Sequence, residues 1–131
     1  MYNYPKYEIT KSIEISSITS IHYFEFDDSF VDVLESHEPW ELVYVDRGEC
    51  DIIADGEVIS LKQGDMYFHK PYENHMIKTV RGIAPNVFII VFSSSSPAMR
   101  YFENKKLEAS MATKQYIAAI IHEAIHCRKI S

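Results

Sequence analysis

The chain has 131 residues, of which 47% are hydrophobic and 13% are aromatic, so we expect one domain with a packed core rather than a disordered segment. Its formal net charge is −6, from 19 acidic and 13 basic residues, which argues against a chain that grips nucleic-acid phosphates by itself.

The location of the protein is indicated by what the sequence lacks and by its cysteines. No apolar run is long enough for a membrane-spanning helix, and residues 1–10 lack the apolar core of a signal peptide. Cys50 and Cys127 lie far apart and form no CxxC pair, so we expect two reduced thiols. Together these features favour a cytoplasmic protein with no membrane partner.

The N-terminal third predicts an arm followed by two short strands. Residues 1–12 are polar and rich in tyrosine, which fits a surface arm and a frayed terminus equally well. Ile13 and Ile15 predict one short strand, and the apolar residues between 18 and 26 predict another. Residues 30–34 are apolar and lead towards the next strand.

The segment 37–48, HEPWELVYVDRG, predicts a strand buried between two layers. Because side chains alternate between faces with period two, His37 and Glu41 are expected on one face, followed by Val43 and Val45. The other face takes residues that we assign to the core, Trp40, Leu42 and Tyr44. A histidine and a carboxylate in an apolar interior need partners, since burying them alone costs several kcal/mol. They form either a satisfied core pair or the polar wall of a binding cavity.

Turn signals at a regular spacing predict further strands. Asp55-Gly56 is the strongest hairpin signal in the chain and favours a type I′ turn. Pro71 stops strand pairing before His75 opens the next strand. The expected strands are residues 50–54, 57–61 and 66–69, a strand from 75, and residues 86–92, which are buried on both faces. Strands at this spacing are typical of an all-β barrel or jelly roll.

The C-terminal part predicts two helices. Four serines followed by Pro97 favour a helix start, so we expect a short helix at residues 98–107. Thr113 is the candidate cap of a second helix that runs from Lys114 to about residue 128. The apolar stripe of this helix includes Ile117, Ile120, Ile121 and Ile125. The stripe packs either on the chain's own barrel or on a second copy, and we favour a homodimer because nothing later in the chain covers it.

The second helix also contains His122-Glu123-Ala124-Ile125-His126. This is the H-E-x-x-H pattern in which two histidines bind zinc and the glutamate acts as general base. The two histidines fall opposite the apolar stripe, and no downstream residue is left to serve as third ligand. We therefore reject a zinc site here and expect both histidines to face solvent.

Two segments carry a resemblance to known families. The pattern H-x3-E-x6-G at residues 37–48 matches the latter part of the first cupin motif, and residues 64–75 keep the spacing of the second. The phrases WELVYVDRG and GDMYFHKPYENH also resemble the sensor domains of AraC-type transcription regulators. The similarity extends over roughly residues 8–110.

The sequence departs from the cupin motifs at several positions. Glu35 stands where the first motif has its first histidine, and Ser29 stands where it has glycine. In the second motif, Lys70, Tyr72 and Thr79 replace proline, glycine and asparagine. These differences put a catalytic metal centre in doubt, but not the barrel.

The resemblance implies a mainly β fold, a cupin-type double-stranded β-helix (jelly roll) with one or two C-terminal α-helices. Residues 1–96 are expected to form the barrel with its N-terminal arm, and residues 97–131 the linker and dimerisation helices. AraC-type regulators carry helix-turn-helix units after such a linker. The sequence shows no helix-turn-helix unit. We therefore expect the DNA-binding domain to be absent from this chain, and we expect DNA to be contacted only through that absent domain.

The function implied by the resemblance is that of an effector-sensing and dimerisation domain of an AraC-family transcription regulator. We expect it to bind a small polar ligand such as a sugar inside the barrel, through Glu35, His37, Glu41 and His75. It is expected to be no enzyme and to need no cofactor. His69 is expected at the surface or at the mouth of the cavity.

A metal-dependent cupin enzyme, an oxygenase or isomerase, is the alternative. His37, Glu41 and His75 would then form a two-histidine-one-carboxylate triad suited to iron or manganese, with Glu35 as a fourth ligand. A bare structural or dimerisation module is a third hypothesis. We favour the sensor because one histidine of the first motif is missing and the two phrases above match regulators better. His22 is read as an ordinary strand residue.

Overall fold

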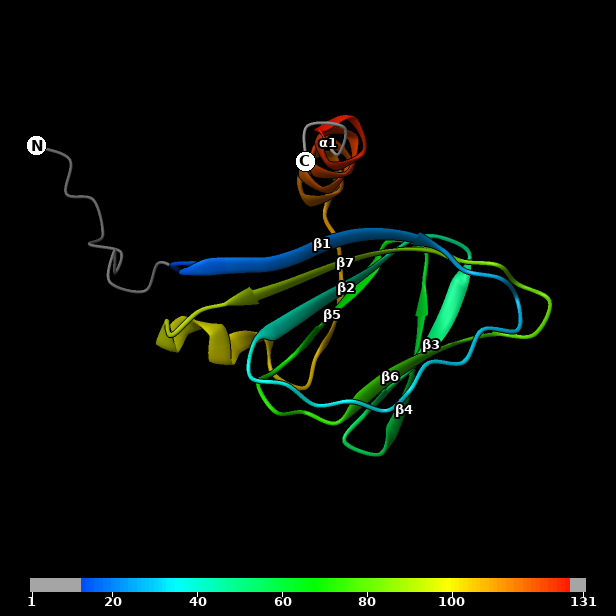
Figure 1. The fold of residues 1–131 in the computed structure, drawn as a ribbon, viewed down its shortest axis with the longest axis horizontal. Coiled ribbons are helices and arrows are strands. Elements are labelled where there is room, and N and C mark those ends of the chain that lie inside the picture. The colour runs from blue at the N-terminus through cyan, green and yellow to red at the C-terminus, as the bar shows by residue number, and fades with distance from the viewer. Residues whose placement is uncertain (1–12, 128–131) are drawn as a thin grey trace, which may run out of the picture.

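Two antiparallel sheets build the domain, and the computed structural model describes residues 13–127 of the chain (Figure 1). One sheet has five strands in the order β1-β7-β2-β5-β8, and the other has three in the order β4-β3-β6. The strands are β1 (Ser17–Glu25), β2 (Trp40–Arg47), β3 (Glu49–Ala54), β4 (Glu57–Lys62), β5 (Asp65–His69), β6 (His75–Thr79), β7 (Asn86–Ser93) and β8 (Lys106–Glu108). The prediction of a mainly β jelly roll with a C-terminal helix is confirmed.

The tight turns depend on residues that accept a positive φ angle. Asp55 (φ 47°) and Gly56 (φ 86°) join β3 to β4, as the predicted type I′ turn requires. Gly48 (φ 74°) joins β2 to β3, and a Cβ atom there would lie 3.1 Å from Cγ2 of Ile83 and 3.3 Å from Cα of Pro85. Only glycine fits this position without displacing the neighbouring backbone.

The main core lies between the two sheets. Val43 and Val45 of β2 point into it, as their alternation predicted, and each is at most 1% exposed. Their partners across the layer include Ile52 and Leu61 of the smaller sheet. Cys50 belongs to the same cluster as a free thiol, and burial raises its pKa to about 12. The side chain of Cys127 lies outside the described residues.

The outer face of the larger sheet is covered by the segment that follows β7. The 3₁₀ helix η2 (Pro97–Phe102) places Met99 against Trp40 and Phe92. The helix α1 (Met111–Cys127) lies over the same sheet, on the side away from the smaller one (Figure 1). Tyr44 and Trp40 are each 4% exposed and belong to this outer layer, as predicted.

The structure corrects three predicted elements. Residues 13–15 form no strand, so the N-terminal region supplies one strand, β1. The predicted helix 98–107 ends at residue 102, because Asn104 takes a left-handed conformation (φ 59°) and the chain turns into β8, which pairs with β5. The cap of α1 is Ser110, whose Oγ accepts a hydrogen bond from the backbone N–H of Thr113 at 3.1 Å.

The apolar stripe of α1 lies partly on the chain's own sheet. Ile117 is 5% exposed and packs with Phe88 and Tyr44, so the expectation that the stripe has no partner within the chain is wrong for this residue. Ile121 packs at the edge of the same cluster, whereas Ile120 is 38% exposed. The side chain of Ile125 and the arm predicted at residues 1–12 lie outside the described residues. Within residues 13–127, no helix is long and apolar enough to cross a bilayer.

Candidate functional site

Glu41 stands on the inner face of β2, where that strand pairs with both β5 and β7. It is 8% exposed, which is unusual for a carboxylate. His37 lies in the loop before β2 and not on the strand, so the period-two argument that placed it beside Glu41 does not apply. Its position is set instead by a hydrogen bond from Nδ1 to the carbonyl oxygen of Pro39 at 2.9 Å. The predicted contact still forms, because Nε2 of His37 is 3.2 Å from Oε1 of Glu41.

An isolated antiparallel β-bridge pairs Glu35, in the loop before β2, with His75 at the start of β6. The backbone N–H of each residue donates to the carbonyl of the other, at 2.9 and 2.8 Å. His75 opens β6 and is 3% exposed. Its Nδ1 donates to the carbonyl oxygen of Glu73 at 2.9 Å, which directs Nε2 towards the two carboxylates.

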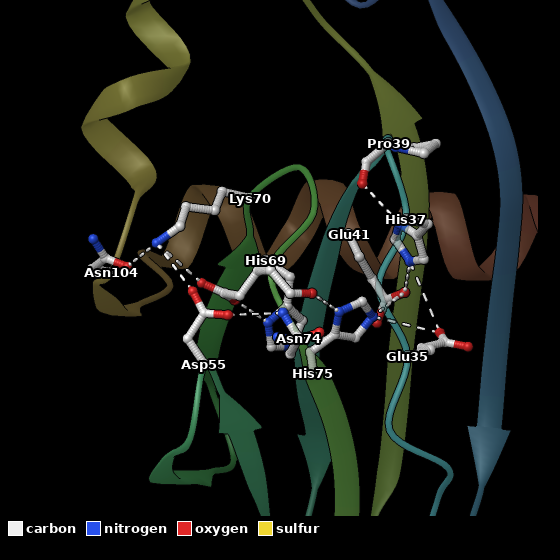
Figure 2. Close-up of polar contacts among 11 residues, drawn as sticks. Glu35, His37, Pro39, Glu41, Asp55, His69, Lys70, Asn74, His75 and Asn104 are labelled. Carbon is white, nitrogen blue, oxygen red and sulfur yellow. Dashed lines mark hydrogen bonds and ion pairs between the residues drawn. The ribbon is translucent and has the colours of Figure 1, made fainter.

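The four residues predicted from the sequence therefore converge on one point (Figure 2). One nitrogen or oxygen of each of Glu35, His37, Glu41 and His75 lies within 4.8 Å of the others. Nε2 of His75 is 3.4 Å from Oε1 of Glu41 and 3.5 Å from Oε1 of Glu35. Among the described residues, this nitrogen is the buried side-chain atom that makes no hydrogen bond of good geometry.

The cluster is strongly coupled electrostatically. Burial lowers the pKa of His75, but the adjacent Glu41 carboxylate and the Glu73 carbonyl outweigh burial and raise the pKa to about 9. Burial raises the pKa of Glu41, but the proximity of His75 outweighs burial and holds the pKa below its usual value. His75 and Glu41 therefore stabilise each other's charged form, and removing either residue would leave the other buried and unpaired.

A second buried pair, His69 and Glu73, packs against His75 of this cluster. His69 of β5 is 1% exposed, and its Nδ1 lies 2.6 Å from Oε1 of Glu73, which is 2% exposed. Lys70 approaches the other oxygen of Glu73 at 3.5 Å. The ring of His69 stacks on that of His75, with centroids 4.4 Å apart.

The expectation that His69 lies at the surface or at a cavity mouth is therefore wrong, and Glu73 was missed. The only sequence signal for this pair was the four-residue spacing of His69 and Glu73. That spacing places the two side chains together only because the chain turns back at Pro71 and Tyr72, where Tyr72 has φ 64°.

A cavity of about 510 Å³ opens beside the cluster, within the size range of small-molecule sites. Its polar end carries Glu35 and Glu41. Most of its wall is apolar or aromatic, and the lining residues of this kind are Phe24, Phe26, Phe30, Ile77, Ile89 and Val91. Ser20, His22 and Asp32 complete the lining, so His22 has a place in the site that the sequence did not indicate.

The H-E-x-x-H segment takes no part in this site. His122 and His126 are exposed, as predicted, and Nδ1 of His126 donates to the carbonyl oxygen of His122 at 2.8 Å. Within the part of the chain that the structure describes, one group of three or more His, Cys, Asp or Glu residues is close enough together to hold a metal ion. It consists of Glu35, His37, Glu41 and His75.

No protein-family model matches the sequence, and no curated protein sequence matches it significantly. Solved structures do match. A predicted oxalate decarboxylase from Thermotoga maritima has a TM-score of 0.55 and 20% identity over 57% of this chain and 66% of that one. A cupin 2 conserved barrel domain protein from Rhodopseudomonas palustris has a TM-score of 0.52 and 18% identity over 77% of this chain and 66% of that one.

A third match is wild-type ToxT from Vibrio cholerae with an unsaturated fatty acid bound, at a TM-score of 0.60 and 4% identity over 83% of this chain and 47% of that one. The chain thus spans less than two thirds of the length of each of these three proteins. At such low identities the likeness concerns the fold alone. It shows that the two packed sheets form a cupin-type jelly roll, as the sequence predicted.

Proposed function

We propose that this domain binds a small molecule in its cavity and serves as the effector-sensing domain of an AraC-type transcription regulator. The observation that carries the proposal is the cavity of about 510 Å³, which is apolar along its wall and has Glu35 and Glu41 at one end. The resemblance of residues 37–48 and 64–75 to such sensor domains supports it. The structural likeness to ToxT, which holds a fatty acid, supports small-molecule binding by a fold of this kind.

The lining changes the expected character of the ligand. A sugar was expected from the sequence, but the aromatic and aliphatic side chains favour a molecule with an apolar body and one polar end. The apolar body would lie along β1 and β7. The polar end would meet the acceptor oxygens of Glu35 and Glu41.

The regulatory part of the proposal needs two further contacts. DNA would be reached only through a C-terminal domain outside this chain. A homodimer would form through the face of α1 that its own sheet leaves open, with Ile120 at its centre and Ile121 at its edge.

A thermal-shift screen of small metabolites tests the proposal. Wild type should be stabilised by at least one compound, because a ligand that binds only the folded state raises its stability. The variant Ser20→Trp should lose the effect, since it fills the cavity from β1. Ser17→Trp is the matched control, because Ser17 is exposed on the same strand and does not line the cavity. Equal stabilisation of Ser20→Trp would place the ligand elsewhere and contradict the proposal.

Metal binding is a second candidate, because a specific observation favours it. His37 and His75 each donate Nδ1–H to a backbone carbonyl, which leaves Nε2 of both rings directed at the carboxylates. Metal-binding histidines in proteins are held in this way. The donor set of two imidazole nitrogens and two carboxylate oxygens suits iron or manganese. Bound there, such an ion would act as a Lewis acid towards an oxygen-containing ligand.

Elemental analysis separates the two candidates. The sensor proposal predicts less than one metal ion per chain in the purified protein. One iron or manganese ion per chain, lost in both His75→Ala and His37→Ala, would instead favour the metal-dependent enzyme, because a site of few ligands rarely survives losing one.

A further inference from the structure

We infer that the cavity takes an organic ammonium ion with an apolar body. This inference rests on the function proposed above and names the chemical class of its ligand. It follows from three features of the lining: the sign of its charges, the arrangement of its aromatic rings and its aliphatic floor.

The charged side chains at the cavity are acidic. Asp32, Glu35 and Glu41 line it, and no lysine or arginine is found among the described residues that do so. Glu35 and Glu41 both turn Oε1 to the histidines, while Oε2 of each makes no hydrogen bond with a residue in the range 13–127. Asp32 accepts a hydrogen bond from the N–H of Val33 and forms no ion pair with a described residue. His75 is cationic at neutral pH because its pKa is raised, and it offsets one of these three carboxylates. A ligand that brings positive charge would balance the remaining negative charge, and one that brings negative charge would meet repulsion.

A row of aromatic rings leads to these carboxylates. Alternate residues of β1 face the same way, which places His22 and Phe24 side by side at 5.3 Å between centroids. The row continues through Phe26, whose ring stacks on that of Phe24 at 5.0 Å and on that of Phe30 at 4.3 Å. Aromatic faces attract cations, above all ammonium groups with attached carbons.

The aliphatic part of the lining accounts for the apolar body. His22 pairs with Ile89 and Ser20 with Val91 across β1 and β7, so both strands present their inner faces to the cavity. Ile77 of β6 closes the opposite side. A short alkyl or arylalkyl chain would remove this surface from water. The volume of about 510 Å³ accommodates such a molecule.

Four probes that share one carbon skeleton test the inference by isothermal titration calorimetry. They are 4-phenylbutylamine, its trimethylammonium analogue, 4-phenylbutanol and 4-phenylbutyrate. The full chain is first freed of metal with a chelator. The amine and the trimethylammonium compound should bind at least tenfold more tightly than the alcohol, and the carboxylate should bind most weakly.

Two variants identify the groups responsible. Glu35→Gln and Asp32→Asn should each weaken the binding of the amine several-fold and that of the alcohol much less, because the amide oxygen still accepts a hydrogen bond from a hydroxyl but carries no charge. Neither position is in the buried core, so both variants keep the fold. Glu57→Gln is the control, because it removes a carboxylate from the exposed side of β4, outside the cavity.

Several results would overturn the inference. Equal affinity for amine and alcohol would mean that the cavity recognises only the apolar body, and tighter binding of the carboxylate would mean that it recognises an anion. Both would leave the proposed function intact. If Mn²⁺ binds at one ion per chain and prevents the amine from binding, the carboxylates act as metal ligands and the inference is wrong. If none of the four probes binds, the ligand class is wrong, and the metabolite screen reports separately on whether the cavity binds any small molecule.

Discussion

At the scale of single residues, Glu73 organises the site without belonging to the cluster that faces the cavity. Oε1 of its carboxylate lies 2.6 Å from Nδ1 of His69, and its backbone carbonyl accepts a hydrogen bond from Nδ1–H of His75 at 2.9 Å. Because that carbonyl can only accept, it holds the Nδ1–H of His75 in place and turns Nε2 towards Glu35 and Glu41. The sequence could not reveal this role, since half of it is performed by a backbone atom.

Replacing Glu73 tests this role. Glu73→Ala should lower the free energy of unfolding by about 3 kcal/mol, because it leaves the buried His69 without its carboxylate and removes one of the two carboxylates that Lys70 contacts. Glu73→Gln keeps an oxygen for His69 and should cost clearly less. Urea denaturation measures both. Equal losses for the two variants would show that the side chain matters for its volume and not for its hydrogen bond.

At the scale of elements, local signals predicted well and long-range context did not. The Asp55-Gly56 hairpin and the apolar β2 followed from a few adjacent residues, because turn chemistry and strand alternation act locally. Residues 103–107 were predicted as helix but form a turn and most of β8, since β5 offers a free edge that no local pattern reveals. Helix α1 was placed correctly in the chain, but the sequence did not show that Ile117 lies on its own sheet.

Helix α1 offers two positions that separate folding from association. Ile117→Ala should cost about 2–5 kcal/mol of stability, because it empties a buried site in the outer layer. Ile120→Glu should leave the fold intact, since that side chain is 38% exposed, and should convert the proposed homodimer to monomer. Thermal denaturation and light scattering measure the two effects. A wild-type mass of 15.2 kDa at tens of micromolar would contradict the dimer.

At the scale of the whole molecule, the site depends on contacts between distant parts of the chain. Spacing and resemblance identified Glu35, His37, Glu41 and His75, and the structure brings these four together. The rest of the cavity could not be predicted, because His22 and Phe24 reach it only through the pairing of β1 with β7, more than 60 residues later in the sequence. Without that pairing, the aromatic residues of β1 have no visible connection to the carboxylates.

The most direct test of the account locates a bound ligand by NMR. The backbone amide signals of the wild-type chain are followed while the strongest compound from the metabolite screen is added. We predict shifts concentrated in residues 20–26, 30–35 and 89–91, together with those of Glu41 and Ile77, because these surround the cavity. Shifts confined to the outer groove lined by Trp40, Ser95 and Arg100, with the cavity residues unchanged, would contradict the account.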